Sequence, residues 1–569
     1  MNLNRLRLQA IISSQARKRD LPYLCELEYL ESTGEQWITI PYKIVTADTF
    51  RHETAQYYTN TSGNQYEGQS SSGNWFGISS GGKYTIGGGV TSSFTASTSS
   101  FDNIVAESDK TGLTLIVNGN VIGTRETKSS GNRVRIFDCE STTTTSYKCY
   151  IRKKYHKLYV NGEIFFDGIP VLDYDMKPAM YDRVTKTFFY NEGTGEDFKF
   201  ALKRGDKRAY TEVEYLESTG QQYINTGYRL KETDTVKHVV KQMYTKTDVS
   251  QYENHINSLR YFGINESGFY TTGVASQIKA STTSYDDIMF LGTPTTAELF
   301  VNGELACSRT GQVVNSLNIF IFGADNGSKG QAYCYVKKKL HQIYVNDVLI
   351  FDGIPVLDYL LRPAMFDRVS GKFFYNEGTG ADFKYGLKDN EGNLYTSVSY
   401  LESTGSQQIT FDFSVTATDS FRHETEQMYT KTTGDQLEGN AIGGGWFGCR
   451  SGIYKPSTFD VVPSTSSFDK IIYNCVNNRS SLTVNDVQLS DSFAKVETTG
   501  FRIFNAYSSY SASYNCYVRK KYHRFYINNK LKFAGVPVIN ANGKPAMFDI
   551  VTKKPFYNDG TGADFIVGE

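Results

Sequence analysis

Histidine and cysteine side chains that could perform acid–base, nucleophilic or metal-binding chemistry return in this chain at intervals of roughly 185 residues. The segment from Cys149 to His156 reads Cys-Tyr-Ile-Arg-Lys-Lys-Tyr-His. Alternate side chains of a strand point to opposite faces, so this spacing predicts that Cys149 and His156 form neither a catalytic pair nor a shared metal site. His156 instead shares a face with Leu158 and Val160, which predicts a hydrogen-bonded core histidine. The recurring sets are Cys149, Cys334 and Cys516; His52, His238 and His423; and His156, His341 and His523.

Carboxylates also recur, and a glycosidase would need two of them across a cleft, about 5–9.5 Å apart. Their neighbours favour a structural role. Glu31 precedes a Ser-Thr-Gly turn and Asp182 follows an aromatic residue near a predicted hairpin end, where carboxylates accept backbone N–H hydrogen bonds. We therefore expect no catalytic residue, and polysaccharide cleavage is the least favoured alternative. The sets are Glu31, Glu217 and Glu402; Glu67, Glu253 and Glu438; and Asp182, Asp367 and Asp549.

Aromatic residues are the strongest candidates for ligand binding. Trp75, Tyr261 and Trp446 each begin an aromatic-Phe-Gly triplet near glycines, and exposed aromatic rings can stack on the C–H faces of sugars. The alternative is an aromatic layer in the core. The triplet Arg152-Lys-Lys154 also has two interpretations: a contact for an anionic glycan, or a solvated edge strand on which lysine prevents aggregation. We favour the edge strand.

All of these residues lie in three copies of one sequence. Each copy opens with Tyr-Leu-Glu-Ser-Thr-Gly and closes with Asn-Glu/Asp-Gly-Thr-Gly. A period of 185 or 186 residues matches a whole domain, which predicts separate domains arranged as beads on a string. We expect a docking segment over 1–24 and repeats over 25–205, 206–393 and 394–569. The opening motifs begin at Tyr29, Tyr215 and Tyr400, and the closing motifs at Asn191, Asn376 and Asn558.

Strand and turn signals are strong within each copy. The segment 113–117, Leu-Thr-Leu-Ile-Val, runs into Asn118-Gly119, and such pairs favour type I′ hairpin turns because both residues tolerate φ > 0. No amphipathic helical window of comparable strength appears inside the repeats. Hairpins of this number must close their sheets on each other, which predicts three tandem all-β sandwich domains. The six turns begin at Asn118, Asn161, Asn302, Asn346, Asn485 and Asn528.

The strand–Val-Asn-Gly–strand pattern resembles the concanavalin A-like, laminin-G-like sandwich superfamily. The opening motif, with Gln-Tyr-Ile-Asn-Thr-Gly at 222–227, and the closing Ala-Met-aromatic-Asp…Asn-Glu-Gly-Thr-Gly resemble a module of gut bacteriophage (crAss-like and prophage) virion proteins. This resemblance covers residues 26–569 and implies jelly-roll domains in a virion. Some concanavalin-like enzymes carry a Glu-x-Asp-x-x-Glu strand, which no copy contains. Copies 1 and 3 differ from this Gln-Tyr-Ile-Asn-Thr-Gly sequence at 36–40 and 408–411. A ligand bound by these residues would therefore differ between copies.

Composition excludes several classes. Sixty basic residues balance sixty acidic residues, whereas a nucleic-acid-binding protein carries a basic excess. No apolar run approaches the ~20 residues of a membrane span. Five of the eight cysteines do not recur, which predicts free thiols rather than a disulfide framework. We expect no cofactor, no metal, no nucleic acid and no membrane partner.

The N-terminal residues 1–24 occur only once. They are basic and lack the apolar core of a secretory signal. Apolar residues at 3, 6, 8, 11 and 12 lie on one stripe of a short helix. We predict a docking helix or tail, with a disordered tail as the alternative. The candidate docking residues are Arg5, Leu6, Arg7, Ile11 and Ile12.

The lack of a complete recurring catalytic set predicts a non-enzymatic protein, and the resemblance implies a structural protein of a phage virion: a head fibre, a capsid decoration or a tail-associated protein. Its N-terminus would bind other virion proteins, and three lectin-like domains would bind host-surface or mucosal glycans with avidity. The chain would be synthesised in the host cytoplasm without a signal peptide, and a homo-oligomer is compatible with the sequence. The alternative is a bacterial cell-surface adhesin or glycan-binding protein, which would need a signal peptide or anchor.

Overall fold

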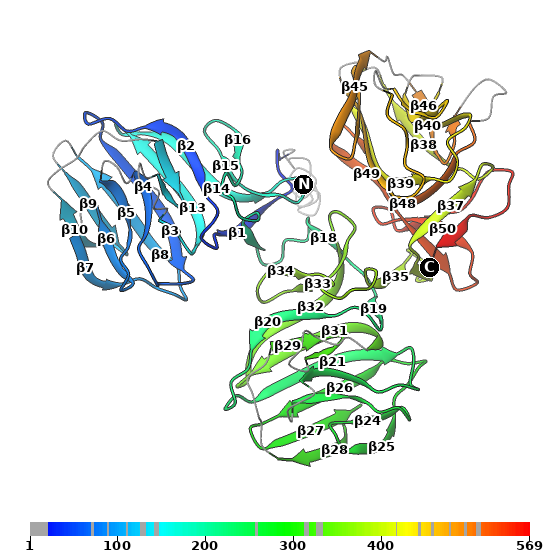
Figure 1. The fold of residues 1–569 in the computed structure, drawn as a ribbon, viewed down its shortest axis with the longest axis horizontal. Coiled ribbons are helices and arrows are strands. Elements are labelled where there is room, and N and C mark those ends of the chain that lie inside the picture. The colour runs from blue at the N-terminus through cyan, green and yellow to red at the C-terminus, as the bar shows by residue number, and fades with distance from the viewer. Residues whose placement is uncertain are drawn as a thin grey trace, which may run out of the picture.

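The computed structural model describes residues 21–568, except 70–72, 88–89, 110–111, 126–132, 141–146, 256–259, 312–317, 326–333, 417, 442–444, 457–459, 477–478, 494–497 and 508–513. All regular secondary structure within these residues is β-strand. The strands form three lobes, one for each repeat (Figure 1). The predicted all-β fold of three tandem sandwich domains is confirmed. The candidate docking residues Arg5, Leu6, Arg7, Ile11 and Ile12 lie outside the described residues.

Repeat 1 consists of two mostly antiparallel sheets that enclose one core. The large sheet has the order β10-β9-β8-β3-β13-β1-β14-β15-β16, and β17 also pairs with β1. The second sheet has the order β2-β11-β4-β5-β6-β7, with β12 on β4. Alternate residues point inwards, so Leu115 and Leu158 of the large sheet share a core with Ile38 and Phe76 of the second. The strands are β1 (Cys25–Glu31), β2 (Ile38–Lys43), β3 (Phe50–Tyr58), β4 (Gln65–Gln69), β5 (Asn74–Ile78), β6 (Lys83–Ile86), β7 (Val90–Thr95), β8 (Asp102–Ser108), β9 (Leu113–Val117), β10 (Asn120–Arg125), β11 (Arg133–Ile136), β12 (Cys139–Glu140), β13 (Ile151–Val160), β14 (Glu163–Leu172), β15 (Pro178–Asp182), β16 (Thr187–Phe189) and β17 (Lys199–Leu202).

Repeat 2 has the same two layers. Its large sheet contains β28-β27-β26-β21-β31 and β32-β33-β34, and its second layer contains β20-β29 and β25-β24-β23-β22-β30. The strands are β18 (Tyr210–Glu212), β19 (Tyr215–Thr219), β20 (Ile224–Arg229), β21 (Val236–Tyr244), β22 (Gln251–His255), β23 (Tyr261–Ile264), β24 (Phe269–Thr271), β25 (Ala275–Lys279), β26 (Asp286–Gly292), β27 (Thr296–Val301), β28 (Glu304–Thr310), β29 (Asn318–Ile321), β30 (Ala324–Asp325), β31 (Tyr335–Val345), β32 (Val348–Asp358), β33 (Pro363–Asp367), β34 (Lys372–Phe374) and β35 (Lys384–Lys388).

Repeat 3 follows the same plan. Its large sheet is built on β45-β44-β43-β39-β48 and β49-β50-β51, and its second layer on β38-β46 and β42-β41-β40-β47. The strands are β36 (Leu394–Ser397), β37 (Tyr400–Thr404), β38 (Ile409–Val415), β39 (Phe421–Tyr429), β40 (Asp435–Asn440), β41 (Gly445–Arg450), β42 (Ile453–Lys455), β43 (Asp469–Val476), β44 (Arg479–Val484), β45 (Val487–Phe493), β46 (Thr498–Ile503), β47 (Ala506–Tyr507), β48 (Tyr517–Ile527), β49 (Lys530–Asn540), β50 (Pro545–Asp549), β51 (Lys554–Phe556) and β52 (Ile566–Gly568).

The six predicted type I′ turns are confirmed. Both central residues of each have φ > 0, as at Asn118 (51°) and Gly119 (82°). The asparagine also ties the turn to the neighbouring strand β8: Asn118 Nδ2 donates to Asp102 Oδ1 at 2.8 Å, and Asp102 Oδ2 accepts from the buried Tyr84 hydroxyl at 2.7 Å. The turn is therefore fixed to the core as well as to its own hairpin. The same amide–carboxylate contact joins Asn161 to Asp48, Asn302 to Asp286, Asn346 to Asp234, Asn485 to Asp469 and Asn528 to Asp419.

The opening and closing motifs of each repeat meet in a clasp. Gln36 Oε1 accepts the Thr33 N–H at 2.8 Å, while Gln36 Nε2 donates to the Glu196 carbonyl at 2.9 Å. Asn191 Oδ1 accepts the N–H groups of Trp37 and Gly193 at 3.3 and 2.7 Å. The two motifs therefore recur because they hold the ends of one domain together. Gln222 and Gln407 make the matching bonds to the carbonyls of Ala381 and Ala563.

The clasp shows which residues of copies 1 and 3 correspond. Gln407, and not Gln408, stands where copy 1 has Gln36, because both accept the N–H three residues earlier. The next residue differs in all three copies: Trp37, Tyr223 or Gln408. The divergence predicted for this region therefore begins at the side chain that follows the clasp glutamine, and it includes Ile40, Thr226 and Phe411.

The repeats are not separate beads, contrary to the prediction. β36 pairs with β35 of repeat 2 and with β49 of repeat 3, so the two large sheets are continuous. Between repeats 1 and 2, the Leu202 N–H donates to the Gly371 carbonyl at 2.9 Å. Gly371 has a φ of 69°, and a Cβ there would lie 2.7 Å from the Leu202 carbonyl oxygen, so glycine is required. Strand pairing across a polar linker leaves no local sequence signal.

Tyr359, which follows β32, contacts both other repeats. Its ring centroid lies 6.1 Å from that of Tyr174 in repeat 1. Its carbonyl accepts from Arg524 Nη2 at 2.8 Å, and Arg524 is itself paired with Glu424 at 3.1 Å within repeat 3. The side chains of Arg524 and Glu424 are 3% and 9% exposed. Buried polar contacts therefore help to fix the orientation of the lobes.

Candidate functional site

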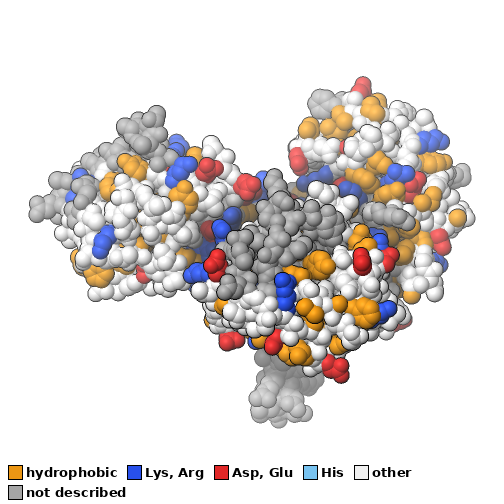
Figure 2. Space-filling view, turned by 60° about the horizontal axis from the view of Figure 1, so that its bottom comes forward, with side chains coloured by type: hydrophobic (Ala, Val, Ile, Leu, Met, Phe, Trp, Pro, Cys, Tyr) orange, Lys and Arg blue, Asp and Glu red, His pale blue; other side chains and the backbone are white. Residues whose placement is uncertain are grey.

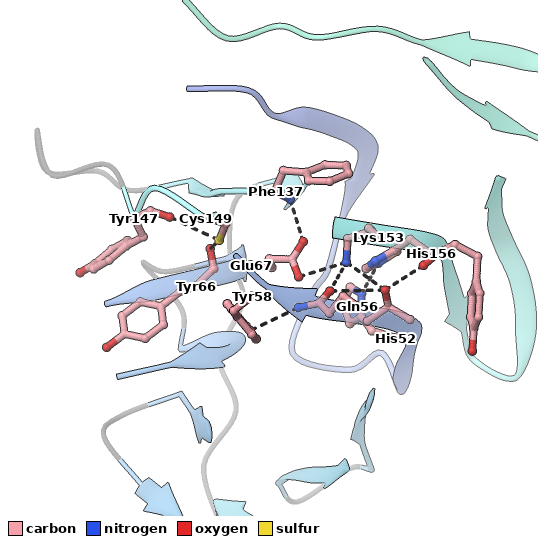
Figure 3. Close-up of polar contacts among 12 residues, drawn as sticks. His52, Gln56, Tyr58, Tyr66, Glu67, Phe137, Tyr147, Cys149, Lys153 and His156 are labelled. Carbon is pink, nitrogen blue, oxygen red and sulfur yellow. Dashed lines mark hydrogen bonds and ion pairs between the residues drawn. The ribbon is translucent and has the colours of Figure 1, made fainter. Parts of the chain in front are cut away.

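A group of buried ionisable side chains lies inside each sandwich, between the two sheets, and Figure 3 shows the group of repeat 1. In repeat 1, Lys153 Nζ on β13 donates to Gln56, to Thr54 Oγ1 at 2.9 Å and to Glu67 Oε2 at 3.1 Å. Glu67, on β4 of the opposite sheet, also accepts the Phe137 N–H at 2.7 Å. The side chains of Lys153 and Glu67 are 0% and 1% exposed. A salt bridge closed to solvent therefore joins the two sheets.

A histidine pair lies beside this salt bridge. His52 Nδ1 and His156 Nε2 are 3.0 Å apart, so one neutral ring donates to the other. Burial lowers the pKa of His52 to about 3, and burial together with the charge of Lys153 holds the pKa of His156 well below its usual range. Both rings are therefore neutral near pH 7. The prediction of a hydrogen-bonded core histidine at His156 is confirmed.

Both features are present in all three repeats. The lysine–glutamate distance is 3.0 Å in repeats 2 and 3, and the paired histidine nitrogens are 2.9 and 3.0 Å apart. A site that recurs three times in closed cores, with no opening to solvent at its charged atoms, is suited to holding sheets together. The matching residues are Lys338, Glu253, His238 and His341 in repeat 2, and Lys520, Glu438, His423 and His523 in repeat 3.

The prediction that Cys149 and His156 point to opposite faces is wrong. The register between β13 and β3 shifts between Lys153 and Tyr155, and one extra residue reverses the alternation of faces. Cys149 and His156 are therefore both buried. The Cys149 thiol donates to the Tyr66 carbonyl at 3.3 Å, and burial raises its pKa well above the usual range. The thiol stays protonated, which makes it a poor nucleophile.

The edge-strand interpretation of Arg152-Lys-Lys154 is also wrong. β13 lies inside the large sheet, between β3 on one side and β1 and β14 on the other. Lys153 points into the core, while Arg152 pairs with Glu31 at 2.7 Å on the outer face. Glu31 is thus a salt-bridge partner on a strand and not the expected acceptor of turn N–H groups. The recurrence of the glutamates could have predicted these ion pairs. The set of Glu31 pairs with the first basic position of the triplet in each repeat, and the set of Glu67 pairs with the second.

The structural role predicted for Asp182 is confirmed. Its Oδ1 accepts the N–H groups of Asp167 and Val184 at 2.8 and 3.1 Å, and its Oδ2 accepts the Thr185 N–H and hydroxyl at 3.1 and 2.6 Å. This carboxylate is fully used in closing the turn after β15. Asp367 and Asp549 accept the same set of bonds.

The predicted ligand-binding aromatics lie on the second sheets, each in its own repeat. Trp75 on β5 is half-buried, whereas its neighbour Phe76 is 2% exposed and belongs to the core. The Trp75 ring stacks on Tyr66 with centroids 3.9 Å apart, and Tyr66 contacts Tyr147 at 4.7 Å. The three rings form a row on the outer face, which we call the aromatic row. The aromatic-Phe-Gly triplet thus contributes its phenylalanine to the core and its first aromatic residue to the surface.

The aromatic row differs between repeats. Tyr261 contacts Tyr252 edge to face at 5.3 Å in repeat 2. In repeat 3 the residue that matches Tyr66 is Leu437, which is buried, so Trp446 has no stacked tyrosine at this position. The structure therefore does not bring Trp75, Tyr261 and Trp446 together, and it gives each a different neighbour.

The described residues contain no group of three or more histidine, cysteine or acidic side chains arranged for a metal ion. All eight cysteines are buried free thiols, as predicted. Within the same part of the chain, no helix has the length and apolar character needed to cross a membrane.

No protein-family model and no curated protein matches the chain. Among solved structures, the LG1-3 region of the laminin alpha2 chain is similar at 9% identity with a TM-score of 0.20, covering 90% of this chain and 98% of that one. Domains LG4-5 of the mouse laminin alpha1 chain are similar at 11% identity with a TM-score of 0.21, covering 58% and 94%. The fold class given above follows from the sheet order of the chain itself.

Proposed function

We propose that this chain is a non-enzymatic, multivalent surface-binding protein of a bacteriophage virion, attached through its N-terminal residues and carrying lectin-like domains that bind glycans. The observation that carries the binding role is the aromatic row of repeat 1. Partly exposed rings of Trp75, Tyr66 and Tyr147 present a continuous apolar surface of the kind on which sugar rings stack. The virion assignment rests on the motif resemblance of the three copies.

The position of the ionisable residues supports a binding role over catalysis. The recurring lysine, glutamate and histidine side chains lie in closed cores, and Asp182 and Glu31 are used by structural partners. The joined repeats present three outer faces in fixed directions. A surface that repeats one glycan would then engage several faces at once, which raises avidity without tight binding at any single site.

Replacing Trp75 by alanine should weaken glycan binding by repeat 1 about two- to tenfold, since an aromatic contact contributes about 0.5–1.5 kcal/mol beyond its buried area. The measurement is a glycan array of bacterial capsular and mucin-type glycans, followed by titration of the best ligand. Trp446→Ala is the matched control, because Leu437 replaces the stacked tyrosine there, and its effect should be smaller. Equal binding by parent and Trp75→Ala would remove the aromatic row from the proposal.

Deletion of residues 1–20 should leave a folded chain that no longer joins the phage particle. The cut spares Tyr23, which packs against Val171 and Tyr181 on the outer face of repeat 1. The measurement is mass spectrometry of purified particles from cells that express either form. Normal incorporation of the truncated chain would contradict the docking role, and absence of the full chain from particles would contradict the virion assignment.

A further inference from the structure

A large groove lies where repeat 1 meets repeat 2. Its volume is about 1040 Å³. One wall is the linker 203–209, and the other is the turn from Arg368 to Lys372 between β33 and β34. Figure 2 shows lysine and arginine side chains gathered where the left-hand lobe of repeat 1 meets the lobe of repeat 2. The groove is thus a charged cleft between two adjoining domains.

The junction of repeats 2 and 3 provides a matched comparison. There the linker 389–393 reads Asp-Asn-Glu-Gly-Asn and lies against the turn that contains Lys553 and Lys554. Asn390 Nδ2 donates to the Thr552 carbonyl at 2.8 Å. Two cavities at this junction measure about 60 and 460 Å³. An acidic polypeptide segment of the chain itself therefore partly fills this junction and faces the basic turn.

The groove of repeats 1 and 2 lacks that acidic segment. Its linker reads Lys-Arg-Gly-Asp-Lys-Arg-Ala, so a basic linker faces a basic turn. Five basic and three acidic residues line the groove. The acidic residues are already paired: Glu28 with Lys154, Glu212 with Lys207 and Asp352 with Arg368.

Two positive charges of the groove are not balanced by a carboxylate in the part of the chain that the structure describes. Arg204 is exposed and has no ion-pair partner among the described residues. Arg152 and Lys372 share the single carboxylate of Glu31, at 2.7 and 3.7 Å. Burial lowers the pKa of Lys372, and the charges of Arg152 and Lys199 act in the same direction. An added anion would relieve this crowding of cations.

We propose that the groove between repeats 1 and 2 binds an acidic, extended segment of a partner protein. The segment would supply the acidic groups that the linker 389–393 supplies at the other junction. Its carboxylates would lie near Arg204 and Lys372, and a side-chain amide of the segment would donate to a carbonyl of the turn 368–372, as the Asn390 side chain donates to the Thr552 carbonyl. Cavities of this size are typical of ligand sites. The proposal does not depend on glycan binding by the aromatic row.

The test uses the full chain and a fluorescent eight-residue peptide of alternating Asp and Glu. Fluorescence anisotropy should show binding at low salt that weakens as salt screens the exposed charges. The double variant Arg204→Glu/Arg368→Gln should bind about tenfold more weakly. The control is Arg183→Gln, which removes the same turn arginine in repeat 1 and the same kind of ion pair, with Asp167, and it should bind like the parent.

Several outcomes would overturn the proposal. These are no binding by the parent, equal binding by the double variant, or equal binding of a neutral peptide of the same length. Polygalacturonate that binds more tightly than the peptide, and that loses affinity in the double variant, would assign the groove to an acidic polysaccharide instead. Thermal unfolding of the single variant Arg204→Glu, whose side chain is exposed, separates loss of the site from loss of the fold.

Discussion

Substitution of Lys153 by methionine should lower the free energy of unfolding of repeat 1 by about 3–5 kcal/mol, because Glu67 would keep its charge in a closed core without a partner. The Glu67 side chain is 1% exposed, and its ion-pair partner among the described residues is Lys153 at 3.1 Å. Urea unfolding of the full chain, followed by a probe in repeat 1, measures the loss.

The double variant Lys153→Met/Glu67→Gln should recover most of that loss. The glutamine keeps an oxygen for the Phe137 N–H, which Glu67 now accepts at 2.7 Å, and no uncompensated charge remains. Lys154→Met is the matched control from the next position in the strand. Its ion pair with Glu28 is about two-fifths exposed on each side, so its effect should stay below about 1 kcal/mol. Equal effects of Lys153→Met and Lys154→Met would show that the buried pair does not hold the sheets.

Acidification should destabilise all three repeats below about pH 6.5, the ordinary histidine pKa. In the folded chain burial lowers the pKa of His52 and His423 to about 3. The unfolded chain therefore binds more protons between these values, so stability is fully present above pH 6.5 and is lost as the pH falls towards 3. Each histidine contributes a slope of about 1.4 kcal/mol per pH unit.

Urea unfolding between pH 4.5 and 7.5 measures this slope. The double variant His52→Phe/His156→Met should flatten the pH dependence of repeat 1 while leaving that of repeats 2 and 3 unchanged. Repeat 3, with His423 and His523 at the same 3.0 Å spacing, serves as the internal control. An unchanged slope in repeat 1 of the variant would mean that carboxylates rather than the histidine pair govern acid unfolding.

The sequence predicted those features that depend on local chemistry. Asn118-Gly119 forms its turn because the two residues accept φ > 0, and the spacing of the hairpins was sufficient to predict a sandwich. Asp182 closes a turn as expected. In each case the residues that decide the structure are near one another in the chain.

The failed predictions depend on contacts between distant segments. A one-residue register shift next to Lys153 reversed the inferred faces of Cys149, and alternation carries no sign of such a shift. The basic triplet was assigned to an edge strand because the strands that flank it in the sheet, at residues 50–58 and 25–31, are far away in the sequence. The polar linker before β36 likewise conceals the pairing that joins repeats 2 and 3.

The clasp between the opening and closing motifs has a consequence for how such chains change in length. Because Gln36 and Asn191 bring the two ends of repeat 1 together, the domain enters and leaves its neighbours at one place. Domains with adjacent ends are the ones that tolerate insertion and circular permutation. A gene that encodes this unit can therefore be lengthened or shortened by whole repeats. The surface residues of each new copy can then change while its two ends still fit the ends of the neighbouring copies.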